Sequence, residues 1–379
     1  MFENRKTGSH FCATCSIMSL VKPSRGGQSR AMPPPAPPAL PRLDALAAED
    51  AAALTDLYIR GTPANTLRAH ARDLVYIRAW KRAAFGTELA WPEGTDVALR
   101  FVLDHARDLT AETGAARATA ETLIAAGLRR SLACPAPATL DRRIASWRAF
   151  HRMRDLPAPF EASLIRQARA KARRACARPP APKSANPITR DVLEAMLAAC
   201  DHSLRGVRDR AVLMLGWASG GRRRAEIAAL MREDIDTRPF AEDGLIRLRL
   251  LETKTTAPDA PAQLVLKGRA ATALMGWIAA ADIAEGPLFR PVSRADRALV
   301  RGLSPDAIRR IVAQRLAQAG YPPGFAAPHG LRSGFLTQAA RDGAPLAAAM
   351  RLSLHRSAAQ AQRYYADADL ADNPATDLL

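Results

Sequence analysis

The sequence has little that suits a secreted, disulfide-linked or membrane protein. Its 379 residues include five cysteines, an odd and scattered set that does not fit a disulfide framework and favours a reducing compartment. No apolar run is long enough to span a bilayer, and the longest, residues 211–218, is better interpreted as a buried helix. The N-terminus lacks the charged, apolar and small-residue succession of a secretory signal. We therefore expect a cytoplasmic protein without a membrane partner.

Acidic residues are scarce relative to basic ones. The chain has 37 Asp and Glu against 55 Lys and Arg, which gives a formal net charge of +18. Such an excess is typical of proteins that neutralise a polyanion such as nucleic acid. Ribosomal proteins and proteins of the membrane surface share this excess, so the charge alone does not identify the partner.

The sequence also lacks a convincing metal or cofactor site. Cys12 and Cys15 form a CxxC motif with His10 close by, but no second pair follows at the spacing of a zinc site. No clustered set of Asp and Glu suggests another metal. We therefore expect neither a metal nor a cofactor.

Composition divides the chain into a tail, two domains and a linker. Residues 1–42 carry seven prolines and little apolar periodicity, so we expect a disordered tail. Apolar residues recur at helical spacing over 43–175, which predicts an all-helical domain. The proline-rich residues 176–187 are expected to form a linker, and residues 188–379 a second domain.

Cations are concentrated toward the end of the first domain. An apolar stripe over residues 140–150 predicts a helix whose remaining surface carries Arg142, Arg143, Arg148 and Arg152. A solvated face and a DNA-contacting face fit these four arginines equally well. Seven cations over residues 159–183 stand against Glu161 alone: Arg166, Arg169, Lys171, Arg173, Arg174, Arg178 and Lys183. This second excess favours contact with DNA.

The second domain contains basic residues in positions that suit phosphate binding. An apolar helix is expected to break at Gly220-Gly221, and the arginines at 222–224 then lie at the start of another helix. Helix N-termini favour anions through unsatisfied backbone amides, so arginines there suit a phosphate. Apolar residues alternate over 246–250 and predict a strand, with residues 263–266 as its hairpin partner. Lys254 lies in the connection between the two.

Four polar side chains near the C-terminus are spaced so that short helices bring them together. They are His329, Arg332, His355 and Tyr364. His329 and Arg332 are three residues apart on a predicted helix that begins after Pro328, so they leave the same face. A guanidinium matches two phosphate oxygens, and a phenol beside cations can form a covalent intermediate. The cluster therefore suits attack on a phosphodiester.

Together these residues resemble the tyrosine recombinases, also called phage integrases. The family motif G-x-R-x-x-E is matched by residues 221–226, which places its arginine at Arg223. Lys254 matches the hairpin lysine, His329 and Arg332 the H-x-x-R motif, His355 the third-box histidine, and Tyr364 the tyrosine nine residues later. The resemblance covers about 188–373 well and extends more loosely over 43–175. It implies a mainly α fold with a small β-sheet, in which an all-α DNA-clamp domain precedes a mixed α+β catalytic domain.

The resemblance also implies a reaction. Tyr364 attacks a scissile phosphate of double-stranded DNA, remains joined to the 3′ phosphate and releases a 5′ hydroxyl. Arg223 and Arg332 bind the non-bridging oxygens, where preorganised positive charge stabilises the transition state. Lys254 gives a proton to the departing 5′ oxygen. The result is site-specific recombination or integration of DNA, the chemistry of many mobile genetic elements.

The two histidines and the assembly complete this expectation. His329 assists proton transfer at the tyrosine, and His355 hydrogen-bonds the phosphate. Strand exchange between two duplexes requires four subunits, so the resemblance implies a homotetramer on paired DNA sites. Accessory DNA-bending or directionality proteins are further expected partners.

Four residues depart from the family pattern or lie next to the matched positions. Leu354 stands where family members usually have glycine before the third-box histidine, so the turn that aims this histidine is expected to differ. Arg222 and Arg224 flank the matched arginine, which leaves a register shift of one residue open. Tyr365 adjoins Tyr364, and the nine-residue spacing alone selects Tyr364.

Two other functions remain open from the sequence. A type IB topoisomerase-like enzyme that nicks and reseals DNA as a monomer would use nearly the same side chains. A catalytically impaired, DNA-binding relative of the family is made conceivable by Leu354. The first would not assemble a tetramer on paired sites, and the second would bind DNA without a covalent adduct.

Overall fold

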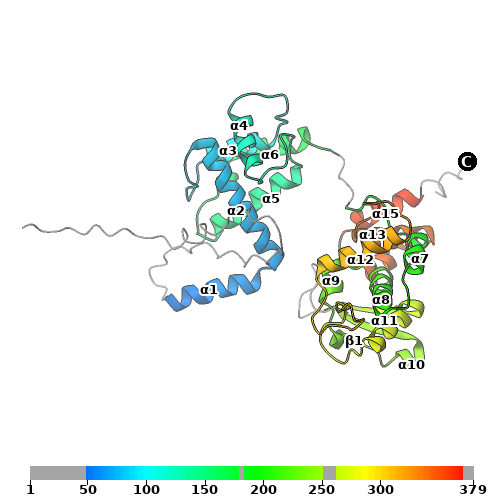
Figure 1. Cartoon of the computed structure of the whole chain (residues 1–379). Helices are drawn as coiled ribbons and strands as arrows, with labels where there is room; N and C mark the ends of the chain where they lie inside the picture. Colours follow the sequence, from blue (N-terminus) through cyan, green and yellow to red (C-terminus); the bar gives the residue numbers. More distant parts are fainter. Residues whose placement is uncertain (1–47, 179–182, 251–261, 370–379) are drawn as a thin grey trace, which may run out of the picture. The chain divides into compact units, whose positions relative to one another are not determined.

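The computed structural model describes residues 48–178, 183–250 and 262–369. It divides into two compact units between Pro179 and Pro180, termed here the N-terminal and C-terminal units (Figure 1). The expected tail, the CxxC motif at residues 12–15 and Lys254 lie outside the described residues. Within the described ranges, no helix combines the length and the apolar character needed to cross a membrane.

The N-terminal unit is helical throughout its described part, as its periodicity predicted. Its elements are α1 (Ala48–Gly61), α2 (Ala64–Phe85), α3 (Thr95–His105), α4 (Ala115–Ala125), α5 (Pro137–Arg152), η2 (Pro159–Glu161) and α6 (Ser163–Ala175). Pro63 precedes α2 and Gly86 ends it with a φ of 69°. The core is aromatic, with the rings of Trp80, Phe101 and Trp147 in edge-to-face contact.

Contacts within the N-terminal unit use several arginines that the sequence placed on a free surface. The expectation is wrong for Arg143, which is buried with its guanidinium carbon 3.2 Å from the centre of the Tyr76 ring. The reason is that α5 packs against α2, where an aromatic face attracts the cation. Arg142 pairs with the buried Asp73. These arginines therefore stabilise the helical unit.

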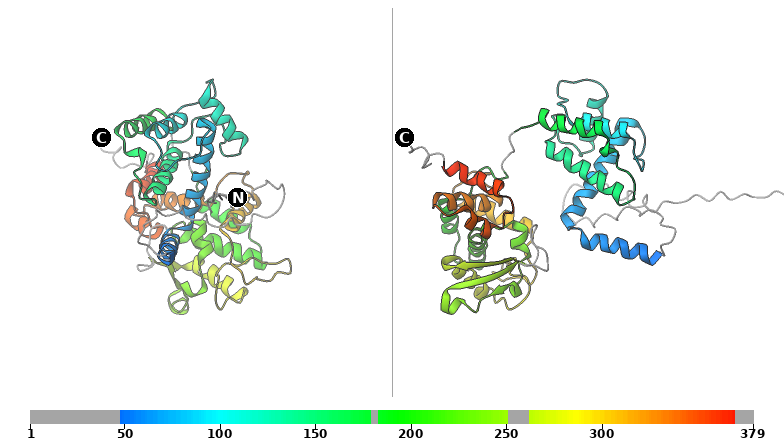
Figure 2. Two further views of the ribbon diagram at one scale, coloured as in Figure 1. Left: turned by 90° about the vertical axis from the view of Figure 1, so that its left-hand side faces the viewer. Right: turned by 180° about the vertical axis from the view of Figure 1, so that it is seen from behind.

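The C-terminal unit combines helices with a small sheet. Its elements are α7 (Arg190–Ala198), α8 (Leu204–Ala218), α9 (Arg224–Ala229), η3 (Arg232–Asp234), β1 (Ile235–Asp236), α10 (Phe240–Asp243), β2 (Leu245–Leu250), β3 (Ala262–Lys267), α11 (Gly268–Ala280), α12 (Pro305–Gln318), α13 (His329–Arg341), α14 (Leu346–Ser353) and α15 (Ala358–Asp369). Figures 1 and 2 show the sheet at one end of this unit and the C-terminal helices, orange to red, at the other. The mainly helical fold with a small sheet is as expected.

The sheet has three antiparallel strands in the order β1-β2-β3. Leu248 of β2 lies opposite Ile235 on one side and Leu264 on the other, and all three side chains are buried. The β2–β3 hairpin was expected from the alternation, since apolar residues face the core and the intervening arginines face solvent. The two-residue strand β1 was not predicted, because so short a segment carries no periodicity.

Helix α8 lies at the centre of the unit and explains how the site is held. One apolar cluster joins α8 to the sheet and α11, and another joins it to α7, α12 and α13. Leu331 of α13 is fully buried in the second cluster. Because α13 is anchored on α8 in this way, the polar residues at its start are fixed next to the end of α8.

Candidate active site

Two left-handed glycines bring the three segments of the site together. Gly220 and Gly221 follow α8 with φ angles of 91° and 71°, so the expected break is present. A Cβ on Gly221 would overlap the backbone of Arg332, and one on Gly220 would overlap the carbonyl group of Leu352. Glycine is the residue that permits both the conformation and the close approach. The turn therefore lies directly against α13 and the end of α14.

Arg223 directly precedes α9 and carries a partly exposed guanidinium. It occupies the position before the first helical residue, and its side chain pairs with Glu226. Its backbone amide donates to the same carboxylate at 3.2 Å. Glu226 therefore orients Arg223 while about a third of the arginine side chain, 35 %, stays exposed to a ligand.

Arg332 and His355 form a direct contact across α13 and the turn after α14. The Nε of Arg332 donates to His355 Nε2 at 3.2 Å, and its Nη1 donates to the carbonyl of Gly221 at 3.2 Å. The hydroxyl of Ser353 lies 2.8 Å from His355 Nδ1. Because a guanidinium has no lone pair to offer, the imidazole must act as the acceptor and is therefore neutral in this contact.

His329 faces the phenol of Tyr364. The imidazole Nε2 lies 3.3 Å from the phenolic oxygen, across the interface between α13 and α15. Helix α13 begins after Pro328, as predicted, and α15 begins after Ser357. The neighbouring Tyr365 is buried in a small core and donates its hydroxyl hydrogen to the carbonyl of Ala344 at 3.0 Å. The two tyrosines therefore have different surroundings, and Tyr364 is the one beside the imidazole.

Burial and nearby positive charge lower the pKa of His329, His355 and Arg332. Burial, followed by the charges of Lys183, Arg332 and Arg223 in that order, lowers the pKa of His329 to about 4. Burial, followed by the charge of Arg332, lowers the pKa of His355 to about 4. Burial also lowers the pKa of Arg332 to about 10. At neutral pH both imidazoles are consequently uncharged and able to accept a proton, while Arg332 stays cationic.

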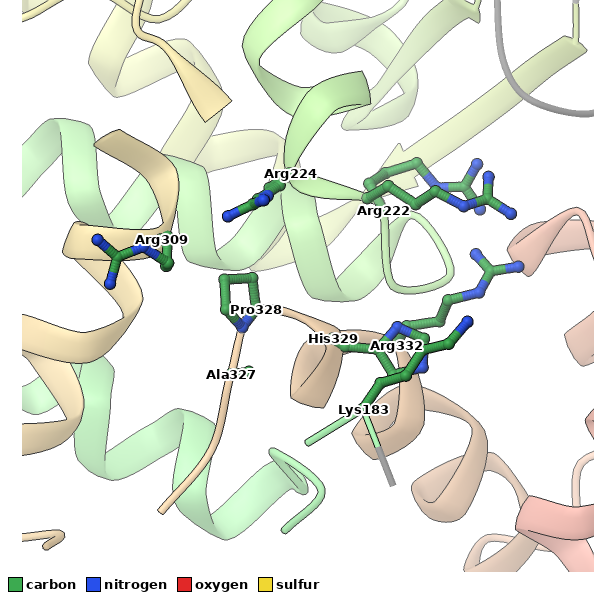
Figure 3. Close-up of a pocket in the computed structure, with 9 residues that line it drawn as sticks. Lys183, Arg222, Arg224, Arg309, Ala327, Pro328, His329 and Arg332 are labelled. Atoms are coloured by element: carbon green, nitrogen blue, oxygen red, sulfur yellow. The ribbon is translucent and has the colours of Figure 1, made fainter. Parts of the chain in front are cut away.

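An open pocket of about 290 Å³ lies over these groups (Figure 3). It is lined by Lys183, Arg222, Arg223, Arg224, Arg309, Ala327, Pro328, His329 and Arg332. Figure 3 shows His329, Arg332 and Lys183 together at the start of α13, facing Arg222. Six of the lining residues are cations and none is acidic, so the pocket suits an anion with several oxygens.

Comparison with known proteins indicates the same family as the sequence motifs. Residues 186–370 match the phage integrase family. The C-terminal unit belongs to this family of tyrosine recombinases. A protein of Selenomonas ruminantium named integrase/recombinase xerD homolog is 28 % identical over 312 residues, which cover 79 % of this chain and 81 % of that protein.

A solved structure of the Tn1549 transposon integrase, in complex with transposon right end DNA, has the same fold. It is 14 % identical, with a TM-score of 0.54 over 86 % of this chain and 98 % of that one. The sequence expectation of a tyrosine recombinase is thereby confirmed at the level of family and fold. The individual residue roles stay predictions.

Five of the six predicted site residues come together in the C-terminal unit. Arg223, His329 and Arg332 line one pocket, while Tyr364 contacts His329 and His355 contacts Arg332. Lys254 lies outside the described residues. Among residues 48–178, 183–250 and 262–369, no three His, Cys, Asp or Glu side chains converge as a metal site would require.

Arg222 is a site residue whose role the sequence did not predict. Its side chain is 1 % exposed, and its Nη2 donates to the carbonyl of Leu352 at 2.7 Å. Its Nη1 lies 3.6 Å from the Glu226 carboxylate, yet Nε and Nη1 have no hydrogen-bond partner in the described part of the chain. Burial lowers the pKa of Arg222 to about 10. The run of three arginines was the available signal, but it does not reveal which member is buried.

Leu354 makes the turn that glycine usually makes in this family. It ends α14 with φ 54° and ψ 43°, and its amide donates to the Met350 carbonyl. This left-handed conformation is costly for a residue with a Cβ. The Leu354 side chain packs against the apolar cluster of α8 and the sheet, which offsets part of that cost. The turn is therefore retained, and His355 still contacts Arg332.

Proposed function

We propose that this tyrosine recombinase cleaves and rejoins DNA through a 3′-phosphotyrosyl intermediate formed by Tyr364. The observation that carries the proposal is the 3.3 Å separation of the Tyr364 hydroxyl from the neutral His329 imidazole beside a cationic pocket. In the first step, the phenolic oxygen attacks the scissile phosphorus while His329 accepts the phenolic proton. The phosphorus–O5′ bond breaks, and Lys254 supplies the proton to the departing 5′ oxygen.

Arg223 and Arg332 are proposed to bind the non-bridging oxygens of the same phosphate. Both line the pocket, and both donate hydrogen bonds to fixed groups, Arg223 to the Glu226 carboxylate and Arg332 to the Gly221 carbonyl. Preorganised cations contribute most where negative charge accumulates in the transition state. His355, which contacts Arg332 and Ser353, is proposed to hydrogen-bond the phosphate. A second 5′ hydroxyl then attacks the phosphotyrosine and reverses the chemistry on a new strand.

The partner we propose is double-stranded DNA, bound by both units. The relative with the same fold was solved with transposon end DNA. In the N-terminal unit, α6 buries only Ile165, and the exposed side chains of Arg166, Lys171 and Arg174 are available for the DNA backbone. Unlike these three residues, Arg169 and Arg173 of α6 pair with Asp141 at 3.1 and 2.8 Å.

We also propose roles for the four segments of the chain. Residues 1–42 form the tail, 43–175 the DNA clamp, 176–187 the linker and 188–379 the catalytic domain.

We propose a homotetramer on paired sites, in the cytoplasm and with accessory DNA-bending or directionality proteins. Exchange of strands between two duplexes needs four nucleophiles, whereas cleavage and resealing of one strand needs one. Cross-linking of the chain on DNA with one and with two sites distinguishes these states. Tetramers that form on paired sites support recombination, and an active monomer on single sites supports a topoisomerase-like reaction.

The cleavage step is tested with nicked duplexes of randomised sequence around the nick. After cleavage, the short fragment between the cleaved bond and the nick dissociates, so its 5′ hydroxyl cannot reverse the reaction. The covalent intermediate is thereby trapped, and adducts are recovered under denaturing conditions. Wild-type protein is expected to form adducts with a selectable sequence. Tyr364→Phe removes the nucleophile and should form none, whereas the matched Tyr365→Phe should retain them. An adduct that persists in Tyr364→Phe rejects the assignment, and no adduct with wild type rejects the reaction.

A further inference from the structure

The first described residues of the C-terminal unit are fastened to the loop that leads into α13. The side-chain and backbone nitrogens of Asn186 donate to the Phe325 carbonyl at 2.9 and 3.1 Å. The amide of Ala327 donates to the Ser184 hydroxyl oxygen at 2.9 Å. The amide of Ile188 donates to the Gly330 carbonyl at 2.8 Å, next to His329. Segment 184–188 and the start of α13 therefore hold each other in place.

Close packing makes this arrangement tight. A Cβ on Gly330 would lie 2.9 Å from the Ser184 hydroxyl oxygen, and a Cβ on Gly334 would overlap the Ile188 carbonyl. The indole nitrogen of Trp217 also donates to the Ile188 carbonyl at 2.9 Å. Since Ser184 is buried, the backbone of the preceding residue, Lys183, is fixed at the rim of the pocket.

The side chain of Lys183 lines the pocket with His329 and Arg332 (Figure 3). It is exposed, and the described part of the chain gives it no carboxylate partner. By contrast, Arg223 is paired with Glu226, and Arg309 with Asp306 at 2.7 Å. Among the charges that lower the His329 pKa, that of Lys183 contributes most, as expected for an ammonium close to the imidazole. An unpaired ammonium at this place can neutralise an incoming phosphate in full.

We propose that Lys183 binds the scissile phosphate, as an additional cation supplied by the segment that begins the C-terminal unit. The inference rests on the proposed cleavage reaction. An ammonium on a flexible stem can follow the phosphate as its geometry changes, whereas Arg223 and Arg332 are held in fixed forks. Lys183 acts here through its charge, and the proton of the leaving group is not assigned to it.

The first test measures single-turnover cleavage by the full chain at saturating DNA, with a nicked duplex recovered by covalent capture. Lys183→Gln is expected to lower the rate about tenfold to a hundredfold, less than the roughly hundredfold to thousandfold loss caused by removing a preorganised oxyanion donor, because the Lys183 side chain is flexible. Lys183→Arg, which keeps the charge, should recover most of the rate. Lys267→Gln serves as the matched control, because it removes the same charge from an exposed position of the same unit.

A second test separates phosphate binding from proton donation. A substrate with sulfur in place of the bridging 5′ oxygen has a leaving group that needs no proton, so it rescues the loss of a general acid. Lys183→Gln is expected to remain slow on this substrate, whereas Lys254→Ala should recover. Rescue of Lys183→Gln by sulfur would overturn the inference, as would a rate equal to that of Lys267→Gln. If wild type cleaves and Lys183→Gln cleaves equally fast, this inference falls and the proposed function stands; if wild type forms no adduct, both fall.

Discussion

The Nη2 of Arg222 donates a 2.7 Å hydrogen bond to the carbonyl oxygen of Leu352, 130 positions later in the chain. This bond ties the arginine run before α9 to the last turn of α14. His355, three residues beyond Leu352, contacts Arg332. Arg222 is therefore a positioning residue for the turn that carries His355, in addition to being a buried cation of the pocket.

Substitution of Arg222 should change the free energy of unfolding little and lower the rate of covalent adduct formation. Arg222→Met removes a buried charge, which is favourable, but it also leaves the Leu352 carbonyl without its donor. Because these effects oppose each other, we expect the free energy of unfolding to change by less than about 2 kcal/mol. Covalent adduct formation at saturating DNA should fall about tenfold, since charge and positioning are both lost. Denaturant unfolding and single-turnover cleavage measure the two effects, and a destabilised variant with normal cleavage would refute the positioning role.

The close approach at Gly221 can be tested against another left-handed glycine. Gly221 and Gly244 have similar φ angles of 71° and 62°, but a Cβ would meet Arg332 at Gly221 and open space at Gly244. Gly244→Ala should cost about 1–2 kcal/mol, the cost of the conformation alone. Gly221→Ala should cost roughly 1–3 kcal/mol more, because the two backbones must separate. If denaturant unfolding shows the same loss of unfolding free energy for both variants, the turn can move without disturbing α13.

The strain at Leu354 predicts an unusual order of stability between two truncations. Leu354→Ala and Leu354→Gly both remove the side chain that packs on the apolar cluster. Only glycine also removes the conflict between a Cβ and the left-handed conformation at φ 54°. The glycine variant should therefore be more stable than the alanine variant by about 1 kcal/mol, as measured by denaturant unfolding. A more stable alanine variant would mean that the turn has another conformation.

The lowered histidine pKa values predict a loss of stability in mild acid. The pKa of His329 is about 4 in the folded protein, against an ordinary value of 6.5. Between these two values the unfolded chain binds more protons, so stability falls as pH falls from about 6.5 to about 4. Melting temperatures of the DNA-free protein across this window should decline less steeply for His329→Gln than for wild type. His202→Gln, at an exposed position, is the control, and identical slopes for all three proteins would contradict the prediction.

Much of the local structure follows from the sequence alone. The start of α13 after Pro328, the break at Gly220-Gly221 and the β2–β3 hairpin are set by interactions between near neighbours. The identities and spacings of His329 and Tyr364, within a set of six, were sufficient to predict the family. Such features depend on periodicity, turn residues and side-chain chemistry, all of which are visible in a linear chain.

The tertiary structure decided which side chain does what within those elements. Arg143 is buried because an aromatic ring on α2 lies opposite it, and Arg222 because the end of α14 supplies a carbonyl. Tyr364 faces His329 because the core under α13 takes Tyr365. Lys183 reaches the pocket because segment 184–188 is bonded to the loop before α13. In each case the deciding partner comes from another element of the fold, and local periodicity carries no information about such long-range contacts.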